Sequence, residues 1–400
     1  MTLFFTPKRG LAKAFTFSTL ALALAACGSE SDFGASGNTA PADTQANQSN
    51  GKRPITVKDQ QLAVGHAAKT ENVTIMTDQG IAVAMTVFYP TLEEGEAAPL
   101  LMHSHGFGGN RVSSLDFEEA EQTSEIGIDT LQVAYNEKNP VQERTGWYVI
   151  SYDQAGHGDS GAEVNIMDPE VEGEMYKAVI DWAENNLSNL AFERQANDFD
   201  PVVGAIGRSY GGAFQLMGAG IDNRLDAMVP NGTWHDLRYS LNPMGVPKTT
   251  YLNGLVLTGL QSIQGRFSPE LYDALVRAST TNEVPAEVVQ RLGSNGAVEY
   301  CTDEDFGAFN RDTELRPIPS LFIQGLRDIL FNINESIASF ECYNAVNPAA
   351  KLISVKYGHS LDGLGMQESP SDSLANTEAK YAFNESKIWL ASNEQSCPAS

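Results

Sequence analysis

The stretch that decides the fold is Val202-Val203-Gly204-Ala205-Ile206-Gly207-Arg208-Ser209-Tyr210-Gly211-Gly212. Its apolar first half predicts a buried strand, and the Ala-Phe-Gln-Leu-Met segment that follows it is compatible with a helix. Between the two lies Gly-x-Ser-x-Gly, which in a strand–turn–helix context is typical of a sharp elbow that presents a serine. A side chain at either flanking glycine would collide with the neighbouring strand and helix in so tight a turn. We therefore predict that Ser209 is a catalytic nucleophile.

The rest of the chain alternates between predicted strands and helices. Two β-branched runs, 73–76 and 81–89, flank a short turn and predict an antiparallel hairpin. Further buried strands are predicted at 99–104, 147–152, 202–207, 224–230, 318–324 and 351–357, and helices within 112–145 and at 170–187, 334–343 and 376–391. Such alternation predicts an α/β fold in which a mostly parallel central sheet is covered by helices on both faces.

The alternation is interrupted between about residues 231 and 316. Glycine, proline and asparagine alternate there with short helical pieces and apolar stretches. We interpret this segment as an inserted cap on a single domain that spans residues 53–400. Because the cap would form the pocket, we expect it to determine substrate specificity.

A serine nucleophile of this kind needs a histidine that accepts its proton and a carboxylate that orients the histidine. In this type of fold the acid and then the histidine follow the serine along the chain, in loops after later strands. Asp328 and His359 occupy such loops. The other histidines all precede the last core strand: His66, His103, His105, His157 and His235. We therefore predict a catalytic triad of Ser209, Asp328 and His359.

A glycine-rich loop, His105-Gly106-Phe107-Gly108-Gly109, directly follows the strand predicted at 99–104. Such a loop can aim backbone N–H groups at developing negative charge, although a plain turn has the same composition. We predict an oxyanion hole formed by the backbone N–H groups of Phe107 and Tyr210. His105, Trp234 and His235 are candidates for the substrate pocket. His105 is better suited to brace its loop by hydrogen bonding, and Trp234 and His235 are equally compatible with core packing.

Residues 1–26 have the features of an export signal. Basic residues precede an apolar run, 14–26, that is shorter than the about 20 residues needed to span a bilayer. Cys27 and Gly28 follow, and this end resembles the lipobox of bacterial lipoproteins. The resemblance implies lipidation of Cys27 and a place in the cell envelope, at the outer membrane; an ordinary cleaved signal is the alternative. Residues 27–52 are rich in small and polar side chains and predict a disordered tether.

The charge of the chain excludes some classes of partner. There are 26 lysines and arginines against 51 aspartates and glutamates, a formal net charge of −25. Such a surface repels nucleic acid, so no nucleic-acid partner is expected. No metal-ligand spacing such as Cys-x-x-Cys or His-Glu-x-x-His occurs, so we predict no metal site. Serine hydrolysis needs no cofactor, and none is expected.

Three cysteines remain after Cys27, and an oxidising compartment allows two of them to pair. Cys397 lies in the last few residues, where fraying is usual. We therefore predict a disulfide between Cys301 and Cys342.

The motifs Gly207-Arg-Ser-Tyr-Gly-Gly, His105-Gly-Phe-Gly-Gly, Gly325-x-x-Asp328 and Gly358-His359 together resemble those of the α/β-hydrolase superfamily. The elbow, followed by Arg224-Leu-Asp-Ala-Met-Val-Pro and Thr233-Trp-His-Asp-Leu, is most similar to the branch of Xaa-Pro dipeptidyl-peptidases and cocaine-esterase-like hydrolases. The resemblance covers roughly residues 70–390 and implies an α/β-hydrolase fold with a Ser-His-Asp triad.

Two departures from that branch favour a plainer acyl hydrolase. The branch often supplies a tyrosine hydroxyl to the oxyanion hole, whereas Phe107 offers only its backbone. Many members also carry a large C-terminal β-domain, and only about 40 residues follow His359. We therefore expect a hydrolase of carboxylic esters that forms an acyl-enzyme intermediate. The alternatives are a peptidase or amidase of the Xaa-Pro dipeptidyl-peptidase type, acyl transfer to another acceptor, and a catalytically silent surface binding protein, which would show a broken triad.

Overall fold

A computed structural model describes residues 55–57, 64–114, 146–195, 198–262, 266–311, 314–356 and 358–359. The chain divides into two units, Met1–Asn50 and Gly51–Ser400, and all described residues lie in the second. The predicted export signal, the predicted tether and the helix predicted at 376–391 lie outside the described residues, as does most of 112–145. No helix of the described ranges is both long and apolar enough to cross a membrane.

The core of the described chain is an eight-stranded sheet with the order β11-β10-β9-β8-β4-β5-β3-β2. Its strands are β2 (Lys69–Met76), β3 (Ala82–Tyr89), β4 (Leu100–Ser104), β5 (Tyr148–Tyr152), β8 (Val203–Arg208), β9 (Leu225–Asn231), β10 (Leu321–Gly325) and β11 (Lys351–Val355). All neighbours from β5 to β11 pair in parallel, and β3 pairs antiparallel with β2 and β5. The mostly parallel sheet of an α/β-hydrolase fold is therefore confirmed.

Burial explains why these segments are strands. β4, β5 and β10 are buried along their whole length, as expected for strands that are covered on both sides. β2 is the edge strand and is mostly exposed, and the turn to β3 uses Gly80 at a φ of 79°. The predicted antiparallel hairpin is therefore present, and its partly solvated strand forms one edge of the sheet.

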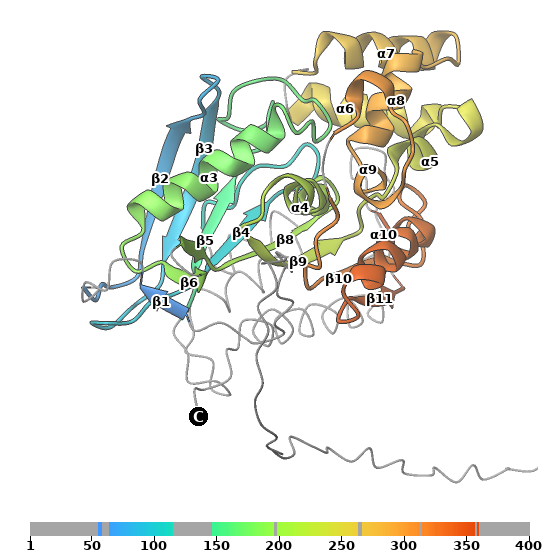
Figure 1. The fold of residues 1–400 in the computed structure, drawn as a ribbon. Helices are drawn as coiled ribbons and strands as arrows, with labels where there is room; N and C mark the ends of the chain where they lie inside the picture. The colour runs from blue at the N-terminus through green and yellow to red at the C-terminus, as the bar shows by residue number, and fades with distance from the viewer. Residues whose placement is uncertain are drawn as a thin grey trace, which may run out of the picture. The chain divides into compact units, whose positions relative to one another are not determined.

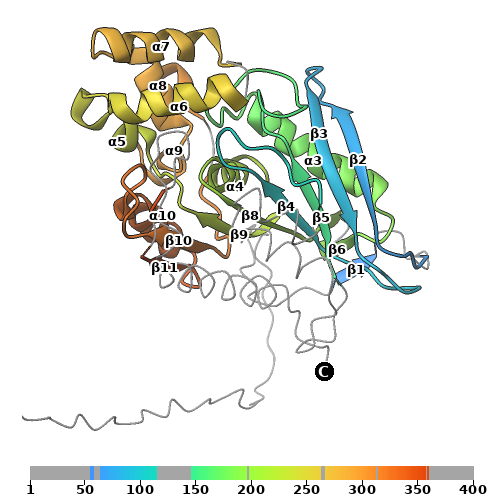
Figure 2. The same cartoon turned by 180° about the vertical axis from the view of Figure 1, so that it is seen from behind.

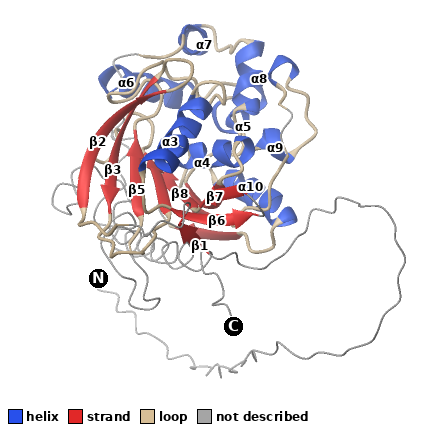
Figure 3. Cartoon of the chain, turned by 60° about the vertical axis from the view of Figure 1, so that its left-hand side comes forward, coloured by secondary structure: helices blue, strands red, loops and turns tan. Residues whose placement is uncertain are grey.

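The described helices of the core pack on one face of this sheet: α3 (Glu172–Asn186), α4 (Tyr210–Ile221) and α10 (Ile333–Val346) (Figure 3). Phe214 of α4 contacts Tyr176 of α3, and Phe322 of β10 contacts Tyr343 of α10, with ring centroids 6.2 Å and 5.8 Å apart. The helices predicted within 112–145 and at 376–391 fall in segments that are not described, so helical cover of the opposite face stays a prediction.

A second, small sheet was not predicted from the sequence. It has the order β1-β6-β7, formed antiparallel by β1 (Ile55–Val57), β6 (Ala191–Gln195) and β7 (Asp198–Pro201). The sequence of residues 191–201 is short and mostly polar, and the third strand of this sheet, β1, lies more than a hundred residues away in sequence. Local patterning carries no signal for such a pairing.

The segment between β9 and β10 forms a helical cap. It contains α5 (Leu237–Leu241), η1 (Pro243–Gly245), α6 (Thr249–Ser262), α7 (Pro269–Thr280), α8 (Ala286–Ser294), α9 (Val298–Cys301) and η2 (Gly307–Phe309). Figures 1 and 2 show these helices gathered beyond the carboxyl ends of the parallel strands, with α7 outermost. The cap thus lies where loops of the core bring the predicted site residues together.

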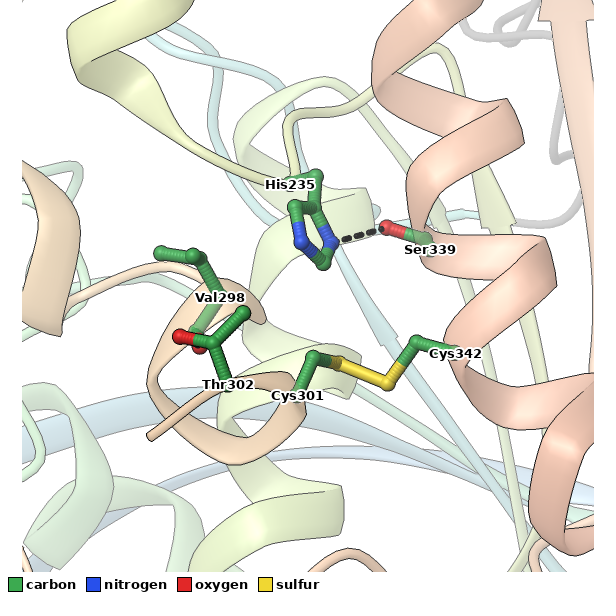
Figure 4. Close-up of a disulfide and its surroundings, with 6 residues drawn as sticks. All are labelled: His235, Val298, Cys301, Thr302, Ser339 and Cys342. Carbon is green, nitrogen blue, oxygen red and sulfur yellow. Dashed lines mark hydrogen bonds between the residues drawn. A yellow bond between two sulfur atoms is a disulfide. The ribbon is translucent and has the colours of Figure 1, made fainter. Parts of the chain in front are cut away.

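A disulfide ties the end of the cap to the core. Cys301 of α9 and Cys342 of α10 are bonded, with Cα atoms 5.7 Å apart (Figure 4). This is the pair that the sequence predicts. His235 lies beside it: its ring is hydrogen-bonded to the Ser339 hydroxyl at 3.2 Å, and its carbonyl accepts from the N–H of Val298 at 3.1 Å. The start and the end of the cap are therefore both held against α10.

Candidate active site

The elbow at Ser209 is a strained turn between β8 and α4. Ser209 has φ 58° and ψ −118°, a backbone conformation that residues other than glycine rarely adopt. A Cβ at Gly207 or Gly211 would overlap the carbonyl oxygen of Ser104, because the elbow lies directly against the end of β4. The backbone N–H of Ser209 donates to the carbonyl of Asn231 at 2.8 Å. The two glycines are therefore required by the close approach of the backbone, as the sequence pattern indicates.

Gln215 of α4 stabilises the elbow through hydrogen bonds of its side-chain amide. Its Nε2 donates to the carbonyl of Gly211 at 2.9 Å, and its Oε1 accepts from the N–H of Val229 on β9 at 2.9 Å. The side chain is fully buried. The amide therefore joins the first turn of α4 to the neighbouring strand, a role that no local sequence signal indicates.

The three predicted triad residues meet at the carboxyl ends of β8, β10 and β11. The hydroxyl of Ser209 donates to Nε2 of His359 at 2.9 Å, and Nδ1–H of His359 donates to Oδ2 of Asp328 at 2.8 Å. These directions follow from the network, because a carboxylate can only accept. The serine, the imidazole and the carboxylate thus form one continuous chain of hydrogen bonds, although 150 residues separate Ser209 from His359.

Backbone and amide donors fix the Asp328 carboxylate. Its Oδ1 accepts from the N–H groups of Leu330 and Phe331, at 3.0 Å and 2.8 Å. Its Oδ2 accepts from Nε2 of Gln324 at 3.0 Å, in addition to His359. Asp328 is buried, so these donors replace water and keep the carboxylate oriented toward the histidine.

The loop that carries His359 is braced from β8. Nη2 of Arg208 donates to the carbonyl of Gly358 at 2.9 Å. The ring of Phe331 meets that of His359 edge-on, with centroids 5.0 Å apart. Arg208 directly precedes the serine, so the same elbow that presents Ser209 also positions the histidine loop.

The predicted oxyanion loop is held by two buried histidines. His105 donates from Nδ1 to the carbonyl of Gly106 at 2.7 Å and accepts the N–H of Gln154 on Nε2 at 3.2 Å. His157 accepts the N–H of Gly108 on Nε2 at 3.1 Å. Burial lowers the pKa of His157 to about 3, which keeps the ring neutral and able to accept. Both side chains therefore position the loop that carries Phe107.

The two predicted oxyanion donors are available for that role. Neither the N–H of Phe107 nor that of Tyr210 bonds to an acceptor within the described residues. Tyr210 is the first residue of α4, where backbone N–H groups have no partner within the helix. Its ring is anchored behind the elbow, because the hydroxyl donates to Oε1 of Glu172 at 3.1 Å.

Glu172 is a buried carboxylate that organises this wall of the site. Besides the Tyr210 hydroxyl it accepts the N–H groups of Asn165 and Asp168, each at 2.9 Å. Burial raises the pKa of Glu172 to about 7. The sequence analysis did not single out Glu172, because a glutamate at the start of an amphipathic helix usually faces water.

An apolar cavity of about 360 Å³ opens onto Ser209 and His359 from beneath the cap. From the core it is lined by the 106–109 loop, Val164, Ile166, Arg208, Tyr210, Leu330 and Phe331, and from the cap by Trp234, Leu237, Leu241, Asn242, Leu252, Leu255, Phe267, Leu271, Ala274, Leu275, Ala278, Val284, Val288 and Leu292. The lining residues of α7 are three or four positions apart (Leu271, Ala274, Leu275 and Ala278), so one face of this helix lies over the cavity. This volume is at the small end for ligand sites.

The cavity corrects part of the predicted pocket. Trp234 lines it, whereas the side chains of His105 and His235 do not. His105 is fully buried and faces the 153–157 loop, and His235 faces away toward Ser339 of α10. Alternation along the chain after β9 explains the difference, since neighbouring residues in extended backbone point in opposite directions.

This arrangement supports proton transfer from a serine to a histidine next to an apolar binding site. The hydroxyl, the imidazole and two backbone N–H groups without an acceptor among the described residues are the parts that acyl transfer requires. Among the described residues, no group of three or more His, Cys, Asp or Glu side chains is arranged to hold a metal ion.

The fold and the site define an α/β-hydrolase of the serine esterase and peptidase type. The family of X-Pro dipeptidyl-peptidases (S15 family) matches residues 79–360, which is more than half of the chain. The chain belongs to this family. No curated protein sequence matches it.

The chain resembles solved structures of an esterase, an aminopeptidase and a puromycin hydrolase. The Pyrococcus furiosus esterase Pf2001 is 15% identical, with 83% of this chain and 98% of the esterase covered and a TM-score of 0.46. An aminopeptidase from a marine sediment Thaumarchaeota archaeon is 15% identical, with coverage of 83% and 56% and a TM-score of 0.49. A puromycin hydrolase is 15% identical, with coverage of 82% and 39% and a TM-score of 0.47.

Proposed function

We propose that this protein hydrolyses carboxylic esters through an acyl-enzyme on Ser209. Nε2 of His359 takes the hydroxyl proton as Oγ attacks the acyl carbon, and Asp328 stabilises the imidazolium that forms. The N–H groups of Phe107 and Tyr210 stabilise the oxyanion of the tetrahedral intermediate. His359 then protonates the leaving alkoxide. Water attacks the acyl-enzyme by the reverse sequence, and the carboxylic acid leaves.

The observation that favours an ester over a peptide is the lining of the cavity. An enzyme that removes residues from a free amino end must bind an ammonium group, and a buried ammonium without an anionic partner is strongly destabilised. The described lining contains no aspartate or glutamate, and Arg208 is its one cation apart from the triad histidine. Such a site favours a neutral, mainly apolar substrate.

A peptidase of the X-Pro type is the second candidate, and family membership supports it. Its chemistry would use the same serine, histidine and oxyanion donors. The leaving group would then be an amine, which His359 must protonate before the C–N bond breaks.

The test compares two panels of chromogenic substrates. p-Nitrophenyl esters of graded chain length and proline-containing peptide p-nitroanilides are offered to the wild type and to Ser209→Ala. We expect ester turnover that is lost in the variant. Turnover confined to the anilides would instead assign the protein to the peptidase candidate.

We also propose that Cys27 carries a lipid and holds the enzyme at the cell envelope. The support is the lipobox-like end of the export signal at Cys27-Gly28. Cys27→Ser is expected to move the protein from the membrane fraction to the soluble fraction. An unchanged membrane fraction would contradict the proposal.

A further inference from the structure

Residues 164–168 form a strained stretch of backbone in the wall of the cavity. Ile166 and Met167 both have a φ of 58°, and Ile166 is branched at Cβ. Left-handed backbone is unfavourable for residues that carry a Cβ, and for a branched side chain it is a genuine outlier. Val164 and Ile166 line the cavity, whereas Met167 is fully buried. Strained backbone persists only where its surroundings hold it in place.

Three N–H groups of this stretch bind one pair of side chains in the core. The carboxylate of Glu172 accepts the N–H of Asn165 on Oε1 and the N–H of Asp168 on Oε2, each at 2.9 Å. The Tyr210 hydroxyl accepts the N–H of Met167 at 3.3 Å and donates to Oε1 of Glu172 at 3.1 Å. One fully buried carboxylate thus fixes the backbone on both sides of the strained pair.

The cap docks on the same stretch. Arg291 of α8 donates from Nη2 to Oδ2 of Asp168 at 2.7 Å. Asn295, which follows α8, donates from Nδ2 to the carbonyl of Asn165 at 3.2 Å. The two residues whose N–H groups Glu172 accepts are therefore also the residues that bind this part of the cap.

We propose that Glu172 is a positioning residue that clamps residues 165–168 and thereby sets the shape of the cavity for the substrate. The inference rests on the proposed ester hydrolysis at Ser209 and names a residue that controls its specificity. Glu172 does not itself line the cavity. It acts on the substrate through Ile166 and through α8, which both contribute to the lining.

The clamp requires a carboxylate. An ionised glutamate is an acceptor at both oxygens, and here both oxygens receive donors. A glutamine of the same size has one acceptor oxygen and one amide group that only donates. In Glu172→Gln the amide nitrogen would face a backbone N–H at one end of the clamp, so one side of the strained pair would be released.

The experiment measures kcat/KM for p-nitrophenyl esters from acetate to octanoate. The pH is about 8.5, above the pKa of about 7 to which burial raises Glu172. Titration with a fluorophosphonate counts the active enzyme, so that unfolded protein does not enter the rates. The variants are Glu172→Gln and Tyr210→Phe, which removes only the hydroxyl and serves where the glutamine variant does not fold.

Asp222→Asn is the matched control. Asp222 is a buried carboxylate that accepts the N–H of Arg224 at 2.9 Å, and it lies at the opposite end of α4 from Ser209. The control therefore removes a buried carboxylate of comparable kind without touching the cavity wall.

We expect Glu172→Gln to lower kcat/KM for the octanoate about 10-fold more than for the acetate, because only the longer chain occupies most of a cavity of about 360 Å³. Tyr210→Phe should shift the chain-length profile in the same direction by a smaller factor, and Asp222→Asn should keep the wild-type profile. A Glu172→Gln enzyme whose kcat/KM changes by the same factor for every ester would overturn the proposal. An equal shift of the profile in Asp222→Asn would overturn it as well.

The wild type separates this proposal from the one on which it rests. Ester turnover by the wild type, with an unaltered profile in Glu172→Gln, overturns the role of Glu172 only. A wild type that turns over no ester overturns ester hydrolysis itself. Peptide p-nitroanilides of graded size then give the same comparison between Glu172→Gln and Asp222→Asn.

Discussion

Gln324 donates a hydrogen bond from Nε2 to Oδ2 of Asp328 at 3.0 Å, the same oxygen that accepts the hydrogen bond of His359 Nδ1–H. The amide is itself fixed at both ends. Its Nε2 also donates to the carbonyl of Phe331 at 2.7 Å, and its Oε1 accepts from the hydroxyl of Ser336 at 2.8 Å. A fully buried residue of β10 therefore orients the acid that orients the histidine.

Gln324→Leu should lower kcat about 10- to 100-fold with little change in KM, because a hydrogen bond to a charged group is worth about 1.5–3 kcal/mol. Substrate does not contact Gln324, so binding should persist. Steady-state kinetics on an ester that the wild type hydrolyses provides the measurement. Gln290→Leu, which removes an exposed amide on α8, is the control. Equal losses of kcat and of folded protein would argue for a structural role only.

Gly211→Ala should destabilise the fold more than Gly212→Ala. A Cβ at Gly211 would overlap the carbonyl oxygen of Ser104 severely, whereas a Cβ at Gly212 would have its nearest neighbours, the Cβ of Thr233 and the carbonyl oxygen of Asn231, at 2.8 Å and 3.1 Å. Overpacking typically costs about 1–3 kcal/mol of stability. We expect Gly211→Ala to lose more than Gly212→Ala, because its clash is the closer one. Urea unfolding of both variants measures the difference. Equal stability would mean that the elbow is less tightly packed than described.

The free energy of unfolding should fall on acidification, because His157 takes up a proton more readily in the unfolded chain than in the folded one. Burial lowers its pKa from 6.5 to about 3. Between these values the unfolded chain binds a proton that the folded chain does not, so the contribution is complete above pH 6.5 and is lost as the pH falls toward 3. The slope is at most about 1.4 kcal/mol per pH unit. His157→Gln should make the free energy of unfolding, measured with urea, less dependent on pH between pH 6.5 and pH 4.5. The slope should fall by an amount of this order. An unchanged slope would show that His157 is already charged in the folded protein.

Loss of the Cys301–Cys342 disulfide should lower the free energy of unfolding by about 2–4 kcal/mol, since it closes a segment with a sequence separation of 41. The Cys301→Ser, Cys342→Ser double variant should nevertheless retain a reactive Ser209, because neither cysteine touches the triad. Thermal unfolding and serine labelling are measured together. Cys397→Ser, for which the sequence predicts no partner, is the matched control. A double variant as stable as the wild type would contradict the expectation.

The sequence was sufficient for the parts of the site that local chemistry fixes. The elbow glycines, Asp328 after β10 and His359 after β11 follow from strand ends and chain order, and the structure brings them within hydrogen-bond distance. Backbone donors such as those of Phe107 and Tyr210 can be proposed by position alone, since their identity does not depend on the side chain, and their role in an oxyanion hole stays a prediction.

The supporting residues could not be predicted because their roles arise from long-range packing. Glu172, Gln215 and Gln324 appear in the sequence as ordinary polar residues of helices and a strand. Each becomes important only when a distant segment supplies its partners. The direction of Trp234 and His235 depended similarly on how the cap docks, so one of these adjacent residues lines the cavity and the other does not.

The central claim is that Ser209 is an activated nucleophile, and labelling by a fluorophosphonate tests it without knowledge of the substrate. The wild type, Ser209→Ala and His359→Ala are treated with the reagent, and the modified residue is located by mass spectrometry of peptides. We predict one adduct on Ser209 in the wild type, none in Ser209→Ala and strongly slowed labelling in His359→Ala. A folded wild type that remains unmodified, or an adduct on another serine, would contradict the account.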